Sequence, residues 1–120
     1  MLTRLTIILT AWLLAGSANA DTRLLMVESE YCHICKQWHR EVGDAYPITD
    51  VGLVAPLLRH DIYDDLPLSV VLNSPAVYTP TFILLDDGHE VSRIEGYPGE
   101  HFFWGLVEMM LDKIPEKGDT

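Results

Sequence analysis

The stretch SEYCHICKQWH, residues Ser29 to His39, holds both cysteines of this 120-residue chain. Cys32 and Cys35 are separated by only two residues, the first of which is His33. Two thiols at this spacing can form a reversible redox pair, help to bind a metal ion or close a structural disulfide. The rest of the sequence helps to choose among these three roles.

The N-terminal segment, residues 1–20, has the pattern of a secretory signal peptide. Arg4 gives a short basic start, an apolar run follows from residue 5 to residue 15, and Ala18-Asn19-Ala20 forms a small-residue cleavage motif. The apolar run is short for a bilayer span, which needs about 20 residues. We therefore expect cleavage after Ala20, with an uncleaved anchor as the alternative, and one mature domain over residues 21–120.

The charge of the chain restricts its partners. Eighteen acidic and eight basic residues give a formal net charge of -10, and loss of Arg4 leaves seven basic against eighteen acidic residues, or -11. Such an acidic surface argues against nucleic acid and against anionic lipid as partners.

The spacing of the two cysteines argues against a purely structural disulfide. Disulfides form and persist in exported proteins. They stabilise a fold mainly by closing a long loop in the unfolded chain, and a gap of two residues closes almost none.

Hydrophobic patterns predict the elements around the cysteine pair. Short apolar runs predict strands at 24–27 and 57–62. Between them we expect a helix that begins near Cys32 and ends at Tyr46-Pro47. Ser29 or Glu30 could cap the start of this helix. Residues 64–75 read as a loop with at most a short helix. Residues 81–85 and 90–95 predict a hairpin around the turn Asp86-Asp87-Gly88.

The C-terminal segment predicts a helix over residues 99–114. One apolar face recurs at helical spacing, and Pro115 ends the pattern; the face consists of Phe103, Leu106, Val107, Met110 and Ile114. The complete order of elements predicts an α/β fold with a central mixed β-sheet flanked by helices.

This order of elements, the CxxC at the first strand-to-helix junction and Thr79-Pro80 before the hairpin resemble the thioredoxin-like fold family. The stretches APLLRHDI (55–62) and YTPTFILLDDGHEVSRIEGYPGEHFFWGL (78–106), together with CHIC, are similar to the periplasmic SoxS-type thioredoxins of bacterial sulfur-oxidation (Sox) systems. The resemblance covers the whole mature chain. It implies a periplasmic thiol-disulfide oxidoreductase that needs no bound cofactor.

The two cysteines are expected to have different roles. A thiol at a helix N-terminus meets unpaired N–H groups and the positive end of the helix dipole, so the thiolate of Cys32 is favoured as the nucleophile. Cys35, one turn later, is expected to resolve the mixed disulfide. His33 between them would, as an imidazolium, stabilise the Cys32 thiolate and make the pair more oxidising. The alternative is a solvent-exposed histidine with little influence.

The resemblance also implies a substrate-binding segment. It predicts a cis peptide between Thr79 and Pro80 that faces the CxxC pair, with the backbone of Thr79 open to an extended substrate. Tyr31 stands where the family usually has Trp, and its aromatic ring can still cover the thiols.

One position departs from the family pattern. Met26 stands where many thioredoxins have a buried acid that helps to move protons from the resolving thiol. The proton acceptor for Cys35 is therefore open, and the candidates are a water molecule, His39, Glu28 and Glu30.

The resemblance implies particular partners. The expected substrate is a protein disulfide, such as an adventitious disulfide on the cysteine of the sulfur carrier SoxYZ. Electrons would come from a membrane thiol transporter of the DsbD or CcdA type, because the periplasm has no glutathione buffer.

Two alternative functions stay open. A disulfide oxidase or isomerase is favoured by His33 between the cysteines. A copper-binding module would use Cys32, Cys35 and either His33 or His39 as soft ligands. Against a metal site, no methionine cluster adjoins the motif, and the other histidines lie on different predicted elements: His60, His89 and His101.

Overall fold

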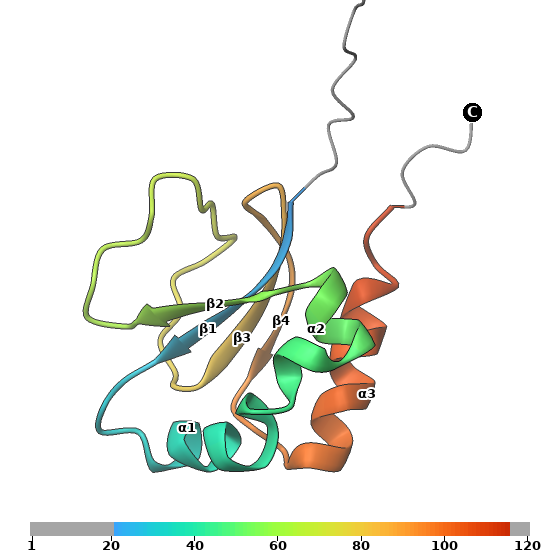
Figure 1. Ribbon diagram of the computed structural model, residues 1–120. Helices are drawn as coiled ribbons and strands as arrows, with labels where there is room; N and C mark the ends of the chain where they lie inside the picture. The colour runs from blue at the N-terminus through green and yellow to red at the C-terminus, as the bar shows by residue number, and fades with distance from the viewer. Residues whose placement is uncertain (1–20, 116–120) are drawn as a thin grey trace, which may run out of the picture.

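The computed structural model describes residues 21–115, so the predicted signal segment lies outside the described residues. Its centre is a four-stranded sheet in the order β2-β1-β3-β4 (Figure 1). Strand β1 pairs in parallel with β2, and both β1–β3 and β3–β4 are antiparallel. The strands are β1 (Thr22–Glu28), β2 (Leu57–Asp61), β3 (Thr81–Asp86) and β4 (His89–Glu95). All four lie where the hydrophobic pattern predicts strands.

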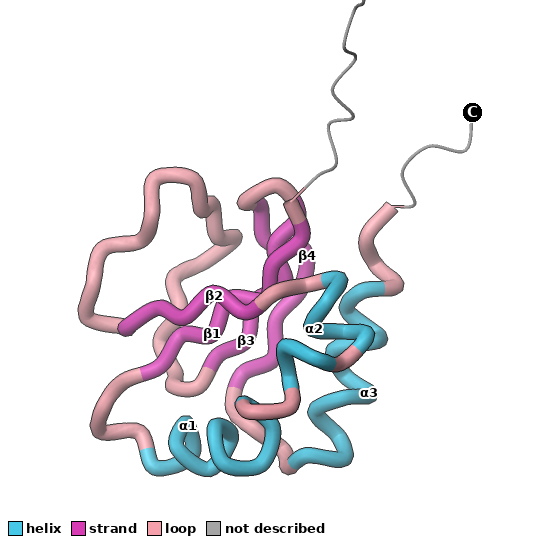
Figure 2. The backbone as a smooth tube through the Cα atoms, in the orientation of Figure 1, coloured by secondary structure: helices cyan, strands magenta, loops and turns pink. Residues whose placement is uncertain are grey.

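The first helix is shorter and less regular than the sequence predicts. Helix α1 (His33–Trp38) continues as one π-helical turn, η1 (His39–Gly43), and a 3-10 turn, η2 (Tyr46–Ile48), follows it (Figure 2). The predicted continuous helix as far as Tyr46-Pro47 is therefore wrong, because the hydrogen-bonding pattern changes at residue 39.

A further short helix, α2 (Asp50–Val54), has no counterpart in the sequence prediction. The Oγ1 atom of Thr49 accepts the backbone N–H of Gly52 at 3.0 Å and caps this helix. A Cβ atom at Gly52 would lie 1.7 Å from the carbonyl oxygen of Tyr46, so only glycine fits where the two segments meet.

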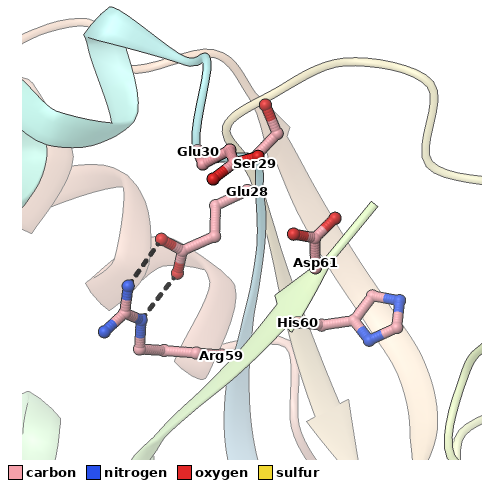
Figure 3. Close-up of a pocket in the computed structure, with 6 residues that line it drawn as sticks. All are labelled: Glu28, Ser29, Glu30, Arg59, His60 and Asp61. Atoms are coloured by element: carbon pink, nitrogen blue, oxygen red, sulfur yellow. Dashed lines mark hydrogen bonds and ion pairs between the residues drawn. The ribbon is translucent and has the colours of Figure 1, made fainter. Parts of the chain in front are cut away.

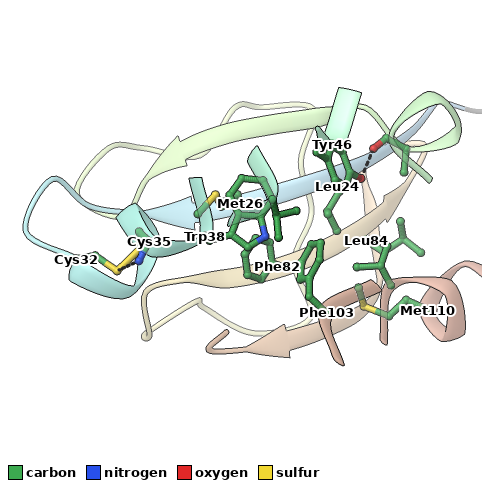
Figure 4. Packing of buried hydrophobic residues seen from close by; sticks show 13 residues of the cluster. Leu24, Met26, Cys32, Cys35, Trp38, Tyr46, Phe82, Leu84, Phe103 and Met110 are labelled. Carbon is green, nitrogen blue, oxygen red and sulfur yellow. Dashed lines mark hydrogen bonds between the residues drawn. A yellow bond between two sulfur atoms is a disulfide. The ribbon is translucent and has the colours of Figure 1, made fainter. Parts of the chain in front are cut away.

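The helices pack against one face of the sheet. Trp38 is fully buried there, with its ring centroid 5.3 Å from that of Phe82 and 5.6 Å from that of Phe103 (Figure 4). Helix α3 (Glu100–Leu111) supplies Phe103, Val107 and Met110 to this core, as its predicted apolar face requires. Burial of these large side chains is the main source of stability on this face.

The opposite face of the sheet is covered by the long loop between β2 and β3. Leu25 and Ile83 point to this side, where loop residues such as Val70 and Leu72 pack against them. Val71 also forms two backbone hydrogen bonds beside β4, donating to the carbonyl of Gly88 and accepting from the N–H of Glu90. The predicted α/β fold with a central mixed sheet is confirmed; helices cover one face of the sheet and this loop covers the other. No helix in the described part of the chain is both long and apolar enough to span a membrane.

Candidate active site

Cys32 is itself the N-cap of helix α1. Its Sγ atom accepts the backbone N–H of Cys35 at 3.0 Å. The predicted cap at Ser29 or Glu30 is therefore wrong, because the Ser29 carbonyl accepts the N–H of Cys32 and the Ser29 hydroxyl accepts that of Tyr31. An N–H directed at Sγ stabilises negative charge on the sulfur, which is the form that attacks a disulfide.

The two cysteines are joined by a disulfide, and their Cα atoms lie 5.2 Å apart. Cys32 keeps 8% of its surface exposed and Cys35 only 1%. Cys35 also belongs to the hydrophobic core that contains Met26 and Trp38 (Figure 4). A partner protein therefore meets Cys32 before Cys35.

His33 and Tyr31 flank Cys32 and both are exposed. Tyr31 has 76% of its surface open to solvent. Its ring is thus available to a partner protein, and it does not pack into the core beside the cysteines. His33 lies at the first position of α1, directly after the N-cap.

The Thr79–Pro80 peptide bond is cis, as the family resemblance implies. Thr81 pairs with Val27 across β1 and β3, so Pro80 lies at the same end of the sheet as the loop that leads to Cys32. The carbonyl of Pro80 accepts the N–H of Gly96 at 2.7 Å. An open groove adjoins this segment and is lined by Tyr78, Thr79, Glu95 and Gly96.

Glu28 and His39, two of the proposed proton acceptors, contact each other. Nε2 of His39 lies 3.0 Å from Oε1 of Glu28, and Arg59 donates two hydrogen bonds of 2.8 Å to the same carboxylate (Figure 3). Burial alone would raise the pKa of Glu28, but the hydrogen bonds and charges of Arg59 and His39 outweigh it and lower that pKa below its ordinary value. Glu28 is therefore ionised at neutral pH.

Sequence reasoning missed the contacts that organise this end of the molecule. Arg59, which pairs with Glu28, comes from strand β2. On β4, Arg93 pairs with Glu90 and also donates a hydrogen bond to the carbonyl of Ser74, in the loop before Pro80. Alternating charges on predicted strands were the available signal, but they do not tell which charges meet across the sheet. Among residues 21–115, no three His, Cys, Asp or Glu side chains gather as a candidate metal site.

No protein-family model matches the chain. It is 30% identical over 92 residues to a "Disulfide bond formation protein" of Brevibacillus choshinensis, covering 74% of this chain and 73% of that one. The fold is similar to the crystal structure of the reduced periplasmic thioredoxin SoxS from Paracoccus pantotrophus, with a TM-score of 0.76 and 41% identity over 78% of this chain and 98% of SoxS.

A second solved structure, the thioredoxin Mala s 13 of Malassezia sympodialis, has a TM-score of 0.51 at 12% identity and covers 75% of each chain. At that identity the match supports the fold alone. The fold, the CxxC pair at a helix start and the relatives at 30% and 41% identity agree. The chain belongs to the thioredoxin family and is a thiol-disulfide oxidoreductase similar to SoxS.

Proposed function

We propose that the mature protein, residues 21–120, works in the periplasm and reduces disulfides on a protein partner. The observation that carries this proposal is Cys32 at the N-cap of α1, whose Sγ accepts the N–H of Cys35 and which keeps 8% of its surface exposed against 1% for Cys35. Export is supported by the signal pattern of residues 1–20 and by the similarity to a periplasmic thioredoxin.

The reaction begins when the Cys32 thiolate attacks one sulfur of the partner disulfide. The partner's S–S bond breaks, its first cysteine leaves as a thiolate that takes up a proton, and a mixed disulfide forms. The Cys35 thiol then loses its proton and attacks Cys32 Sγ, which releases the second partner thiol. Two electrons pass to the partner, and Cys32–Cys35 becomes the disulfide seen in the structure.

The other residues at this end assist the exchange. Thr79 and Pro80 offer backbone to an extended partner segment, and the exposed ring of Tyr31 packs against it. His33 tunes the potential of the pair through its position one residue after Cys32. No bound cofactor takes part in these steps.

We infer that the partner is the sulfur carrier SoxYZ, whose cysteine the protein would keep as a thiol. A membrane thiol transporter of the DsbD or CcdA type would return two electrons to Cys32–Cys35. This part of the proposal is supported by the 41% identity to SoxS.

A second function, disulfide donation or isomerisation, is favoured by His33 and by the name of the Brevibacillus relative. The reduction potential of the pair separates the two. A value of about -270 mV or lower supports a reductase, whereas a value of about -120 mV supports a disulfide donor.

Trapping tests the partner. Cys35→Ser leaves Cys32 able to form a mixed disulfide that is not resolved, and Cys32→Ser is the matched control. We expect Cys35→Ser to capture the carrier's cysteine. Capture of other periplasmic proteins without the carrier would contradict SoxYZ as partner and leave the oxidoreductase activity intact.

A further inference from the structure

We propose that Glu95 makes the groove beside Thr79 select partner segments that carry a lysine or arginine next to the reacting cysteine. The inference rests on the proposed function, because it requires a protein disulfide to dock along Thr79. Tyr78, Thr79 and Gly96 complete the lining of this groove, and none of them carries a formal charge. The carboxylate of Glu95 therefore sets the charge of the groove.

The negative charge of Glu95 is not cancelled by its neighbour Arg93. Nη1 of Arg93 lies 3.8 Å from Oε1 of Glu95, but the guanidinium is already bound to Glu90. Nε donates to Oε2 of Glu90 at 2.9 Å and Nη2 to Oε1 at 2.5 Å. Only 5% of the Glu90 side chain is exposed, against 48% for Glu95. Arg93 thus pairs mainly with Glu90, and its single positive charge faces two carboxylates, so the three side chains leave a net negative charge beside the groove.

The same pair anchors the chain four residues before the groove residue Tyr78. Nη2 of Arg93 donates to the carbonyl of Ser74 at 2.7 Å, and Oε1 of Glu90 accepts the N–H of Asn73 at 3.1 Å. Beyond this anchor the chain reaches Tyr78, whose carbonyl accepts the hydroxyl of Thr81 at 2.7 Å. Both ends of the segment before Thr79 are thus hydrogen-bonded without a partner, which reduces the ordering that binding requires.

The occupant that fits this groove is an extended protein segment with a basic side chain. Backbone recognition along Thr79 is independent of sequence, and specificity must come from side-chain contacts beside it. A half-exposed carboxylate favours a nearby lysine or arginine and disfavours an acid. The net charge of -10 attracts basic partners at long range. This attraction does not depend on how the partner is oriented, so it does not select the residue beside the partner's cysteine.

Two peptides test the selection. Each carries one cysteine as a mixed disulfide with 2-mercaptoethanol, and the two differ only by lysine or glutamate beside that cysteine. The second-order rate constant of their reduction by the fully reduced mature protein is measured after acid quenching. We expect the lysine peptide to react about two- to fivefold faster, the range expected for an exposed ion pair. Glu95→Gln should abolish the preference and Glu95→Lys should reverse it.

Glu108→Gln is the matched control. Glu108 is exposed on helix α3 and its substitution changes the net charge by the same amount. It should leave the peptide preference unchanged. An equal loss of preference in Glu108→Gln and Glu95→Gln, or an unchanged preference in Glu95→Gln, would overturn the inference. If dithiothreitol reduces both peptides and the protein reduces neither, the reductase function is wrong, and the inference that rests on it is overturned too.

Discussion

Nε2 of His39 lies 3.0 Å from Oε1 of Glu28, and this contact connects the π-helical turn after α1 to the end of strand β1. The proton acceptor for Cys35 was open among groups that included these two residues. Each of these two side chains is therefore already engaged by a hydrogen-bond partner. Met26, where the family resemblance implies a buried acid, lies in the apolar core. The contact with His39 therefore lies two residues further along β1, at Glu28.

Glu28→Gln should lower the free energy of unfolding by about 1–3 kcal/mol at pH 7, because it weakens charge-assisted hydrogen bonds to Arg59 and His39. The folded-state pKa of Glu28 lies below its ordinary value of 4.5. Its stabilising contribution is therefore complete above pH 4.5 and is lost as the pH falls through the folded pKa. Urea unfolding of wild type and Glu28→Gln at pH 7 and pH 3 measures this. Glu30→Gln, at an exposed neighbour, should change little.

His33→Gln should make the Cys32–Cys35 pair more reducing. An imidazolium beside Cys32 favours the thiolate and so the reduced state of the pair. His33 is exposed, so solvent screens its effect on Cys32, and we expect a shift of at most about 30 mV, which corresponds to about 1.4 kcal/mol. Equilibration in graded thiol-disulfide buffers measures the potential. His101→Gln on α3 serves as the control, and an equal shift there would contradict a local effect.

Arg93→Met should weaken substrate binding without changing the potential of the cysteine pair. Arg93 holds the carbonyl of Ser74 and neutralises Glu90, and neither contact touches the sulfur atoms. We expect a severalfold rise in KM for a protein disulfide, with kcat little changed. Loss of a partner of the buried Glu90 should also cost about 3 kcal/mol of stability.

The double variant Glu90→Gln/Arg93→Met separates the two effects of Arg93→Met. It removes the unpaired buried charge and should recover much of the stability, while KM stays high. Recovery of KM together with stability would show that Arg93 does not position the loop. Arg40→Met, at an exposed arginine of the π-helical turn, is the control.

Tyr46→Phe should destabilise the fold and leave the redox activity unchanged. The Tyr46 hydroxyl donates to the carbonyl of Ala55 at 2.6 Å, and the residue is fully buried. Loss of this hydrogen bond should cost about 1–1.5 kcal/mol at pH 7. Burial raises the pKa of Tyr46 above its ordinary value of 10.0. The stabilisation is complete below pH 10 and falls as the pH rises further, because the unfolded tyrosine then ionises first.

The Tyr46 comparison is made by urea unfolding at pH 7 and pH 11. The difference between wild type and Tyr46→Phe should shrink at the higher pH. Tyr63→Phe, at a tyrosine with 78% exposure, should not alter stability at either pH.

Local patterns made much of the fold predictable. Leu24–Val27 and Thr81–Leu85 are apolar runs of strand length, and both lie within strands buried in the sheet. The spacing of Phe103, Val107 and Met110 predicted the buried face of α3. Helix α2 was missed because it is only five residues long. It depends on the cap at Thr49 and on the close approach of Gly52 to Tyr46, and the spacing of apolar residues does not reveal such contacts.

The redox pair and its place at a strand-to-helix junction could be predicted from a short stretch, because the spacing of Cys32 and Cys35 and the start of a helix are local properties. Which charged side chains contact each other depends on the arrangement of the strands in space. Arg59 reaches Glu28 from a neighbouring strand, and Arg93 reaches Ser74 across the edge of β4. Such pairs depend on strand order and register, which are set by burial over the whole core and are not encoded by any short stretch.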